Sequence, residues 1–364
     1  MQDFPRIPLA VLSTPIQKLE NISRLLNTNV YIKRDDLSWE KNQMINAGID
    51  LQMFDGYIGF SVDYYNTNTS NMLLYVPVPL LTGYSTSLQN LGKVNNRGWE
   101  LALTSQHTFA NGFGYSFNAN YAKNTNEVKE LGPGNAPIIS SGSVAHAYYI
   151  TEVGKPIGNY YLLVQDGIFA TEEDLKKYPH FDNTEVGDFR FVDVDGDGKL
   201  DLDKDRTICG NYMPKFTYGF GGKLWYAGFD MDFNFQGVYG NKILNLNKRY
   251  LDNMEGNTNG TKIALDRWKS PENPGSGSVN KANRKQTGYN SRTSTWHLES
   301  GSYLRLQNLS LGYTLPRALT QKFKVEKMRV YVSGQNLFTI TDYSGYNPEV
   351  NARPSQNLTP GEDY

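Results

Sequence analysis

The sequence has no long hydrophobic run, and no apolar stretch approaches the roughly 20 residues that a membrane-spanning helix needs. Its one cysteine, Cys209, excludes an intrachain disulfide, and no cluster of cysteine and histidine offers a zinc site. The formal net charge of −1 gives no support for nucleic-acid binding. The four histidines are scattered and no nucleophile–base–acid arrangement accompanies them, so no catalytic residue is expected.

What the sequence does contain is a series of segments in which apolar and polar residues alternate. They include residues 45–53, 58–64, 113–121, 216–226 and 229–236. Side chains along a strand point alternately to its two faces, so each segment predicts a strand with one apolar and one polar face. A soluble sandwich also alternates, but it rarely sustains such long strands with so many aromatics on one face. The 25 tyrosines suit the aromatic girdles of a membrane β-barrel.

The connections also favour a barrel, because such proteins combine short turns at one end with long outer loops at the other. Gly228 predicts a tight turn between two of the alternating segments. At Gln307 and Asn308 the apolar phase slips, and we expect a β-bulge there.

Residues 1–37 have a different pattern and predict a short α/β appendage. Thr14, Pro15 and Gln17 form a helix-start signal, and a short strand is expected at 30–32. The words at 4–10, 14–16 and 31–37 resemble the start of the D-cysteine desulfhydrase and aminocyclopropane-carboxylate deaminase family, whose members use pyridoxal phosphate. The family's Gly-Asn-Lys segment, which supplies the Schiff-base lysine, is replaced by Ser38-Trp39-Glu40-Lys41. We therefore expect no pyridoxal phosphate and no catalysis.

From Trp39 onward the chain resembles the TonB-linked outer-membrane proteins of the SusC/RagA family. The resemblance rests on words that run in family order: 63–66, 73–79, 90–100, 153–158, 166–169, 210–220, 235–241, 303–313 and 330–338. It implies import driven by TonB through a plug domain, with a SusD-like surface lipoprotein as lid and a glycan or peptide as ligand. We expect the signal peptide and the plug to be missing before residue 39, and the family's last strand to be missing at the other end.

The expected fold is therefore all-β: residues 39–364 form an incomplete antiparallel transmembrane β-barrel, with about ten of the roughly 22 strands of large transporters. The expected surroundings are outer-membrane lipid, a SusD-like lipoprotein and an oligosaccharide or peptide ligand. TonB would act only through the missing plug.

Three long polar segments, residues 126–160, 165–213 and 241–300, predict outer loops that carry recognition. Planar aromatics stack on sugar faces or peptide side chains, and the candidates are Tyr160, Tyr161, Trp268 and Trp296. The alternative for each is that it only packs against neighbouring loops.

One acidic motif has the spacing of a calcium loop. Carboxylates at Asp193, Asp195, Asp197 and Asp201 occupy positions 1, 3, 5 and 9, and Gly198 occupies position 6. Lys199 would offer its backbone carbonyl. Position 12, where an acid is expected, holds Lys204, so Asp205 would have to reach the ion. The alternative is a solvated acidic loop whose glycines simply turn.

The leading interpretation is part of an outer-membrane importer for nutrient oligomers, not an enzyme. One alternative is a chimeric or truncated product without activity, which the change of pattern at residue 38 favours. The other is an inactive remnant of a pyridoxal-phosphate enzyme.

Overall fold

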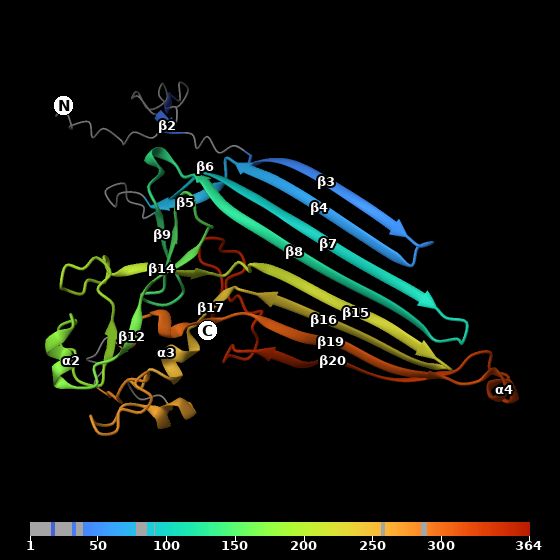
Figure 1. Ribbon diagram of the computed structural model, residues 1–364. Helices are drawn as coiled ribbons and strands as arrows, with labels where there is room; N and C mark the ends of the chain where they lie inside the picture. The colour runs from blue at the N-terminus through green and yellow to red at the C-terminus, as the bar shows by residue number, and fades with distance from the viewer. Residues whose placement is uncertain are drawn as a thin grey trace, which may run out of the picture.

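The largest unit of the protein is an eight-stranded antiparallel sheet (Figure 1). The computed structural model describes residues 16–18, 31–33, 39–77, 86–90, 92–255, 259–284 and 290–364. The eight strands are β3 (Lys41–Met53), β4 (Ile58–Ser70), β7 (Lys93–Thr108), β8 (Gly114–Glu130), β15 (Phe216–Tyr226), β16 (Phe229–Tyr239), β19 (Tyr303–Thr314) and β20 (Arg329–Thr341). Their order is β20-β19-β16-β15-β8-β7-β4-β3. Within the described chain β3 and β20 are the two edges, so the sheet is an open, incomplete barrel wall.

The two faces of this sheet differ as the alternation predicts. On one face Val62 pairs with Leu101, and Leu101 with Tyr121. On the other face Asp63 pairs with Glu100. The apolar face is largely uncovered, since Ile49, Leu103 and Val332 are all exposed. The sheet therefore presents one apolar face, called the outward face below, and one polar face, called the inward face.

Two local features confirm sequence predictions. Ala227 and Gly228 form the turn between β15 and β16, and both have positive φ, as a tight hairpin of this twist requires. The register of β19 shifts between Leu306 and Asn308 against both of its neighbours. Against β16, Gln307 is the extra residue of a bulge, whereas against β20 two residues, Asn336 and Leu337, lie opposite it. The bulge keeps Leu306 and Leu309 on the outward face although three positions separate them.

The β4–β7, β8–β15 and β16–β19 connections lie at one end of the sheet, and the short turns lie at the other, together with residues 315–328 between β19 and β20 (Figure 1). Between β4 and β7 lie β5 (Leu73–Pro77) and β6 (Thr86–Asn90). Between β8 and β15 lie η2 (Pro133–Asn135), β9 (Ile138–Ser141), β10 (Tyr148–Thr151), β11 (Asn159–Leu163), β12 (Gln165–Ile168), α2 (Glu172–Lys177), β13 (Phe189–Phe191) and β14 (Arg206–Asn211). Between β16 and β19 lie β17 (Lys242–Asn245), α3 (Asn247–Leu251), η3 (Lys262–Asp266), η4 (Thr295–His297) and β18 (Leu298–Ser300). The turn end holds α4 (Arg317–Thr320) and η5 (Gln321–Phe323).

These connections are ordered rather than simple loops, and they differ in detail from the expectation. Residues 126–130 belong to β8, and residues 159–163 form a strand of a second sheet with order β14-β11-β10-β9. The buried apolar clusters of the described residues lie at this end of the sheet. One joins Val94 of β7 and Val128 of β8 to Ile157, and another joins Tyr149, Tyr160 and Leu244. The hydrophobic core therefore lies in the loop body and where that body meets the ends of β7 and β8.

The C-terminal segment docks onto this loop body. Its strand β21 (Glu362–Asp363) pairs in parallel with β17. Glu362 is fully buried, and its carboxylate accepts hydrogen bonds from the Tyr149 hydroxyl at 3.1 Å and the Ser143 backbone N–H. A buried carboxylate without such donors would cost several kcal/mol, roughly, so these contacts hold the segment in place.

At the N-terminus, β1 (Ile16–Lys18) pairs with β2 (Tyr31–Lys33) in an antiparallel ladder. The strand near residue 31 confirms the prediction, whereas the predicted helix is wrong at residues 16–18, where cross-strand pairing replaces the local capping preference. Thr14 and Pro15 lie outside the described residues, as does the rest of the expected helix. Among the described helices, none is both long and apolar enough to cross a membrane.

Candidate ligand-binding surface

A cavity of about 430 Å³ opens where the inward face of the sheet meets the loop body. Five carboxamide side chains line it: Asn96, Asn126, Asn351, Gln356 and Asn357. Its aliphatic lining comes from Met72, Val94, Ile157 and Met213, and Tyr212 contributes one ring. None of the described residues that line it carries a charge. The cavity therefore suits a neutral polar molecule with some apolar surface.

The wall side of the cavity is fixed by hydrogen bonds among its amides. Asn126 donates from Nδ2 to Oδ1 of Asn96 at 2.9 Å. The Oδ1 of Asn126 in turn accepts the backbone N–H of Ile157 at 2.9 Å. Neighbouring strands β7 and β8 place Asn96 and Asn126 opposite each other. The sheet thus sets the position of both amides, and one of them ties the loop body to the wall.

The other side of the cavity is the C-terminal segment. Oδ1 of Asn351 accepts the backbone N–H groups of Arg353 at 3.3 Å and Gly361 at 3.1 Å, which holds residues 351–361 in a closed loop. The Gly361 carbonyl accepts the N–H of Leu244 at 2.9 Å and the Tyr160 hydroxyl at 3.0 Å. Sequence reasoning missed this cavity, because its residues come from six separate stretches of the chain.

The structure corrects the prediction for Tyr160. Its ring is fully buried, and its hydroxyl donates to the carbonyls of Lys242 and Gly361, both at 3.0 Å. Burial raises the pKa of this hydroxyl well above its usual value, so it stays protonated and remains a donor. Tyr160 is a packing residue that no ligand can reach in this structure.

The other three aromatic candidates are half-buried and lie in the loop body. Trp268 packs on the cluster around Phe181 and Phe189, and its Nε1 donates to the Ala170 carbonyl at 3.3 Å. The ring of Trp296 lies 5.2 Å from that of Phe189. The structure brings Trp268 and Trp296 to one cluster. Neither they nor Tyr161 line the amide cavity, and their role in binding stays a prediction.

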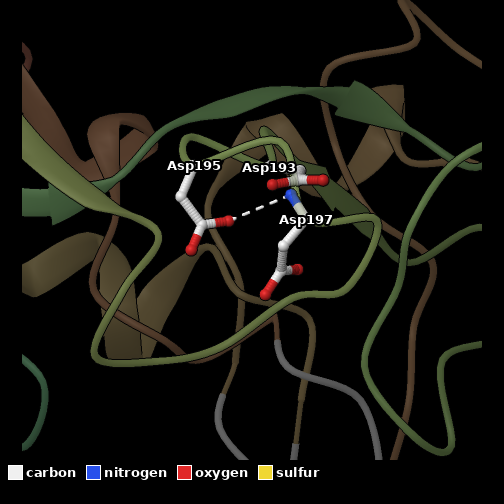
Figure 2. Close-up of side chains that lie close together, drawn as sticks. All are labelled: Asp193, Asp195 and Asp197. Carbon is white, nitrogen blue, oxygen red and sulfur yellow. Dashed lines mark hydrogen bonds between the residues drawn. The ribbon is translucent and has the colours of Figure 1, made fainter.

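The carboxylates of Asp193, Asp195 and Asp197 converge in the acidic loop (Figure 2). One oxygen from each lies within 4.8 Å of the others. Gly198 has φ +81° and donates its N–H to Oδ2 of Asp193 at 2.9 Å, so the chain turns back over the first carboxylate. Three of the predicted ligands are therefore brought together, and the donor set is the oxygen chemistry that Ca²⁺ prefers.

The remaining predicted ligands have other roles. Asp205 is fully buried and accepts the N–H groups of Val194 at 2.8 Å and Asp201 at 2.6 Å, so it closes the base of the loop. Asp201 caps the following turn by accepting the N–H of Asp203 at 2.7 Å. Neither carboxylate belongs to the converging group, which corrects the expectation that Asp205 reaches the ion. Lys199 donates its backbone N–H to Asp197 Oδ1 at 2.9 Å, and its carbonyl stays a predicted ligand.

Two histidines of the loop body, the buried His297 and the half-buried His146, have no catalytic arrangement around them. Burial, together with the charges of Lys248 and Arg249, lowers the pKa of His297 to about 3. Burial and the neighbouring Arg292 lower the pKa of His146 to about 4. Both rings are therefore neutral at pH 7, and neither is placed as a base beside a nucleophile.

Comparison with known proteins decides the family. Residues 17–337 match the model of the TonB dependent receptor-like β-barrel family. The chain belongs to this family. The SusC/RagA resemblance is confirmed by relatives that match most of the chain, which are TonB-dependent receptors and not enzymes. TonB-dependent receptor P3 of Formosa agariphila is 34% identical over 331 residues, covering 89% of this chain and 32% of the relative. TonB-dependent receptor SusC of Bacteroides thetaiotaomicron is 26% identical, covering 90% of this chain and 31% of the relative.

Among solved structures, the RagAB peptide transporter superposes with a TM-score of 0.72 at 24% identity, covering 96% of this chain and 36% of that chain. This likeness shows the fold. The chain thus spans about a third of the length of the receptors it matches.

The resemblance of residues 1–37 to deaminases also has a counterpart. A protein of Pyrococcus horikoshii named for 1-aminocyclopropane-1-carboxylate deaminase is 60% identical over 35 residues, which is 10% of this chain. The receptor family match begins at residue 17, inside that segment. The domain boundary at residue 38 therefore stays a prediction.

Proposed function

We propose that this chain forms wall and outer-loop surface of a TonB-dependent outer-membrane importer for nutrient oligomers, a glycan or a peptide, that works with a SusD-like surface lipoprotein. The observation that supports it most is the two-faced sheet. An apolar outward face suits lipid, and a polar inward face suits an aqueous lumen. The named relatives SusC and RagAB support the partner and the TonB-driven step.

Within this proposal the amide cavity binds part of the ligand. It lies at the lumen side of the wall and at the loop end, where a molecule arriving from outside meets the barrel. Amides offer both donors and acceptors, and the lack of charge in the lining matches a neutral oligomer.

Growth tests the import function. The gene that encodes the whole receptor is deleted, and growth is measured on neutral oligosaccharides and on peptides as the sole carbon source. We expect growth to be lost on one class and restored by the unaltered gene. Normal growth of the deletion strain on every oligomer would contradict import.

A matched pair of variants tests the cavity. Met213→Trp fills the cavity, whereas Met231→Trp makes the same change on the outward face of β16. We expect Met213→Trp to raise the half-saturating oligomer concentration at least about tenfold, which is about 1.4 kcal/mol of binding. Met231→Trp should leave it unchanged. If the two variants had the same half-saturating oligomer concentration, the cavity would not be part of the binding surface.

We also propose that the acidic loop binds calcium through Asp193, Asp195 and Asp197. Their convergence within 4.8 Å supports this, because three close carboxylates repel one another and Lys204, 3.7 Å from Asp197, balances only one of the three negative charges. Calorimetric titration of the receptor with CaCl₂ tests it. The double variant Asp193→Asn/Asp195→Asn should abolish the heat of binding. Asp203→Asn, in the same segment but 89% exposed and facing Arg206, should preserve it. No calcium binding by the unaltered receptor up to millimolar concentration would refute the site.

A further inference from the structure

The outward face of the sheet changes character abruptly toward the loop end. Tyr64 on β4 pairs with Trp99 on β7, and the centroids of their rings lie 4.8 Å apart. Below them, toward the turns, this face carries Val62, Leu101 and Leu103. Aromatic residues gather where a barrel wall meets lipid headgroups. Tyr64 and Trp99 therefore mark the outer boundary of the apolar band.

Basic residues lie on the same face at and just beyond this boundary. Lys123 on β8 pairs with Trp99, so it stands level with the aromatic pair. Arg97 lies two positions from Trp99 and pairs with Asn66, so alternation places it on the same face one step further out. Both side chains are exposed. Lys129 lies further along β8, near the loop end.

These charges are only partly balanced by acids nearby. Glu127, also on β8, contacts Lys129 at 2.7 Å and Arg97 at 3.9 Å. The Glu127 carboxylate therefore pairs mainly with Lys129. Arg97, whose side chain is 52% exposed, makes only the longer contact with it. Among Arg97, Lys123, Lys129 and Glu127 the net charge is +2, from three cations and one anion. The neighbouring side chains Asn66, Asn68 and Asn95 are neutral and bond one another.

We propose that Arg97 and Lys123, supported by Lys129, bind the phosphate groups of a phosphorylated glycolipid in the outer leaflet. The inference rests on the proposed function, because it needs the outward face to contact membrane lipid. Two adjacent cations at headgroup depth match a diphosphorylated headgroup in charge, and guanidinium binds phosphate through two parallel hydrogen bonds. The aromatic pair and the aliphatic band below would contact the upper part of the acyl chains.

Lipid binding to the purified whole receptor tests the proposal. The receptor is held in non-ionic detergent and titrated with diphosphoryl lipid A, with enzymatically dephosphorylated lipid A, and with phosphatidylethanolamine, and retained lipid is measured by native mass spectrometry. The variant is Arg97→Gln/Lys123→Gln. The matched control, Lys223→Gln/Lys322→Gln, removes the same charge from the inward face and from the turn end.

We expect the variant to bind diphosphoryl lipid A about tenfold to thirtyfold more weakly, since each basic residue near a charged headgroup layer contributes roughly one decade or less. The control should bind like the unaltered receptor, and binding should weaken as NaCl is raised. The proposal would be overturned if the variant bound diphosphoryl lipid A as tightly as the unaltered receptor does. It would also be overturned if the unaltered receptor bound dephosphorylated and diphosphoryl lipid A equally well. In both cases retained lipid would still support a membrane wall. If the unaltered receptor retained none of the three lipids, the proposed membrane function would fail as well.

Discussion

At the scale of single residues, the structure separates side chains that hold the loop body together from those that a ligand can reach. Tyr160 and Tyr161 are adjacent in sequence, yet one is fully buried and the other half-buried. Tyr160 points to the face of β11 that packs with Tyr149 and Leu244, and Tyr161 points to the opposite face, although Asn159 and Leu163 on that face are buried as well. Sequence alone named both as aromatic candidates, and it had no means to tell which side faced the core.

Substitution of Tyr160 and of Tyr161 tests whether the first holds the loop body together and the second does not. Tyr160→Phe removes the hydroxyl that donates to the Lys242 and Gly361 carbonyls, so we expect a loss of about 1–2 kcal/mol in the free energy of unfolding of the loop body. Tyr161→Phe should change it by less than about 0.5 kcal/mol. Unfolding in detergent, followed by tryptophan fluorescence, measures both. A Tyr160→Phe variant as stable as the unaltered protein would mean that the two hydrogen bonds contribute nothing.

Buried histidine gives a prediction for acid. In the folded protein the pKa of His297 is lowered to about 3, whereas in the unfolded chain it is about 6.5. Between these two pH values the imidazole is protonated in the unfolded state and neutral in the folded state. Stability therefore falls as pH drops from about 6.5 toward 3, by up to about 2 kcal/mol at pH 5. The Ser294 N–H donates a hydrogen bond to Nδ1 of His297 at 3.2 Å. In His297→Asn the side-chain oxygen of asparagine can accept this hydrogen bond instead.

Thermal unfolding at pH 7 and pH 5 checks this sign. We expect the difference in midpoint between the two pH values to shrink in His297→Asn but not in the control His180→Asn, which changes an exposed histidine elsewhere in the loop body. If His297→Asn loses stability equally at both pH values without narrowing the difference, the buried ring is not the source of acid sensitivity.

At the scale of elements, the strands follow from alternation, while their irregularities follow from register. The bulge at Gln307 is visible in the sequence as a slip of phase, because apolar residues must return to the lipid side. The ordered strands of the outer connections were not predicted. They are short, between three and six residues, and several depend on partners far away in the chain, as β11 does on β14 and β17 on β18.

Deleting one residue tests the bulge. Removal of Gln307 leaves Leu306, Asn308 and Leu309 in unbroken alternation against β16, so we expect the receptor to assemble nearly as well as the unaltered one. Removal of Ser310 shifts every residue after it to the opposite face and should abolish assembly. Heat-modifiable migration of the outer-membrane fraction reports assembly. Failure of both deletions alike would show that the bulge is required and not merely accommodated.

At the scale of the whole molecule, the sheet has two edges and an uncovered apolar face. Backbone groups along β3 and β20 lack partners on one side within the described chain, and Val330, Val332 and Ile340 are all exposed on the edge strand β20. Such edges and faces drive association in water. We expect this chain, expressed by itself without detergent, to aggregate. A soluble monomer by light scattering after gel filtration would contradict the barrel-wall interpretation.

The sequence by itself determined the strands of the large sheet, their two faces, the tight turn at Gly228 and the family, because period-two alternation and local turn residues are properties of neighbouring positions. It also placed three carboxylates of the acidic loop, since one glycine-rich turn suffices to bring them together. Only the tertiary structure decided that Tyr160 is core, that Asp205 closes a loop, and that residues near 70, 96, 126, 213 and 356 share one cavity. Those outcomes depend on contacts between distant segments, whose geometry no local pattern specifies.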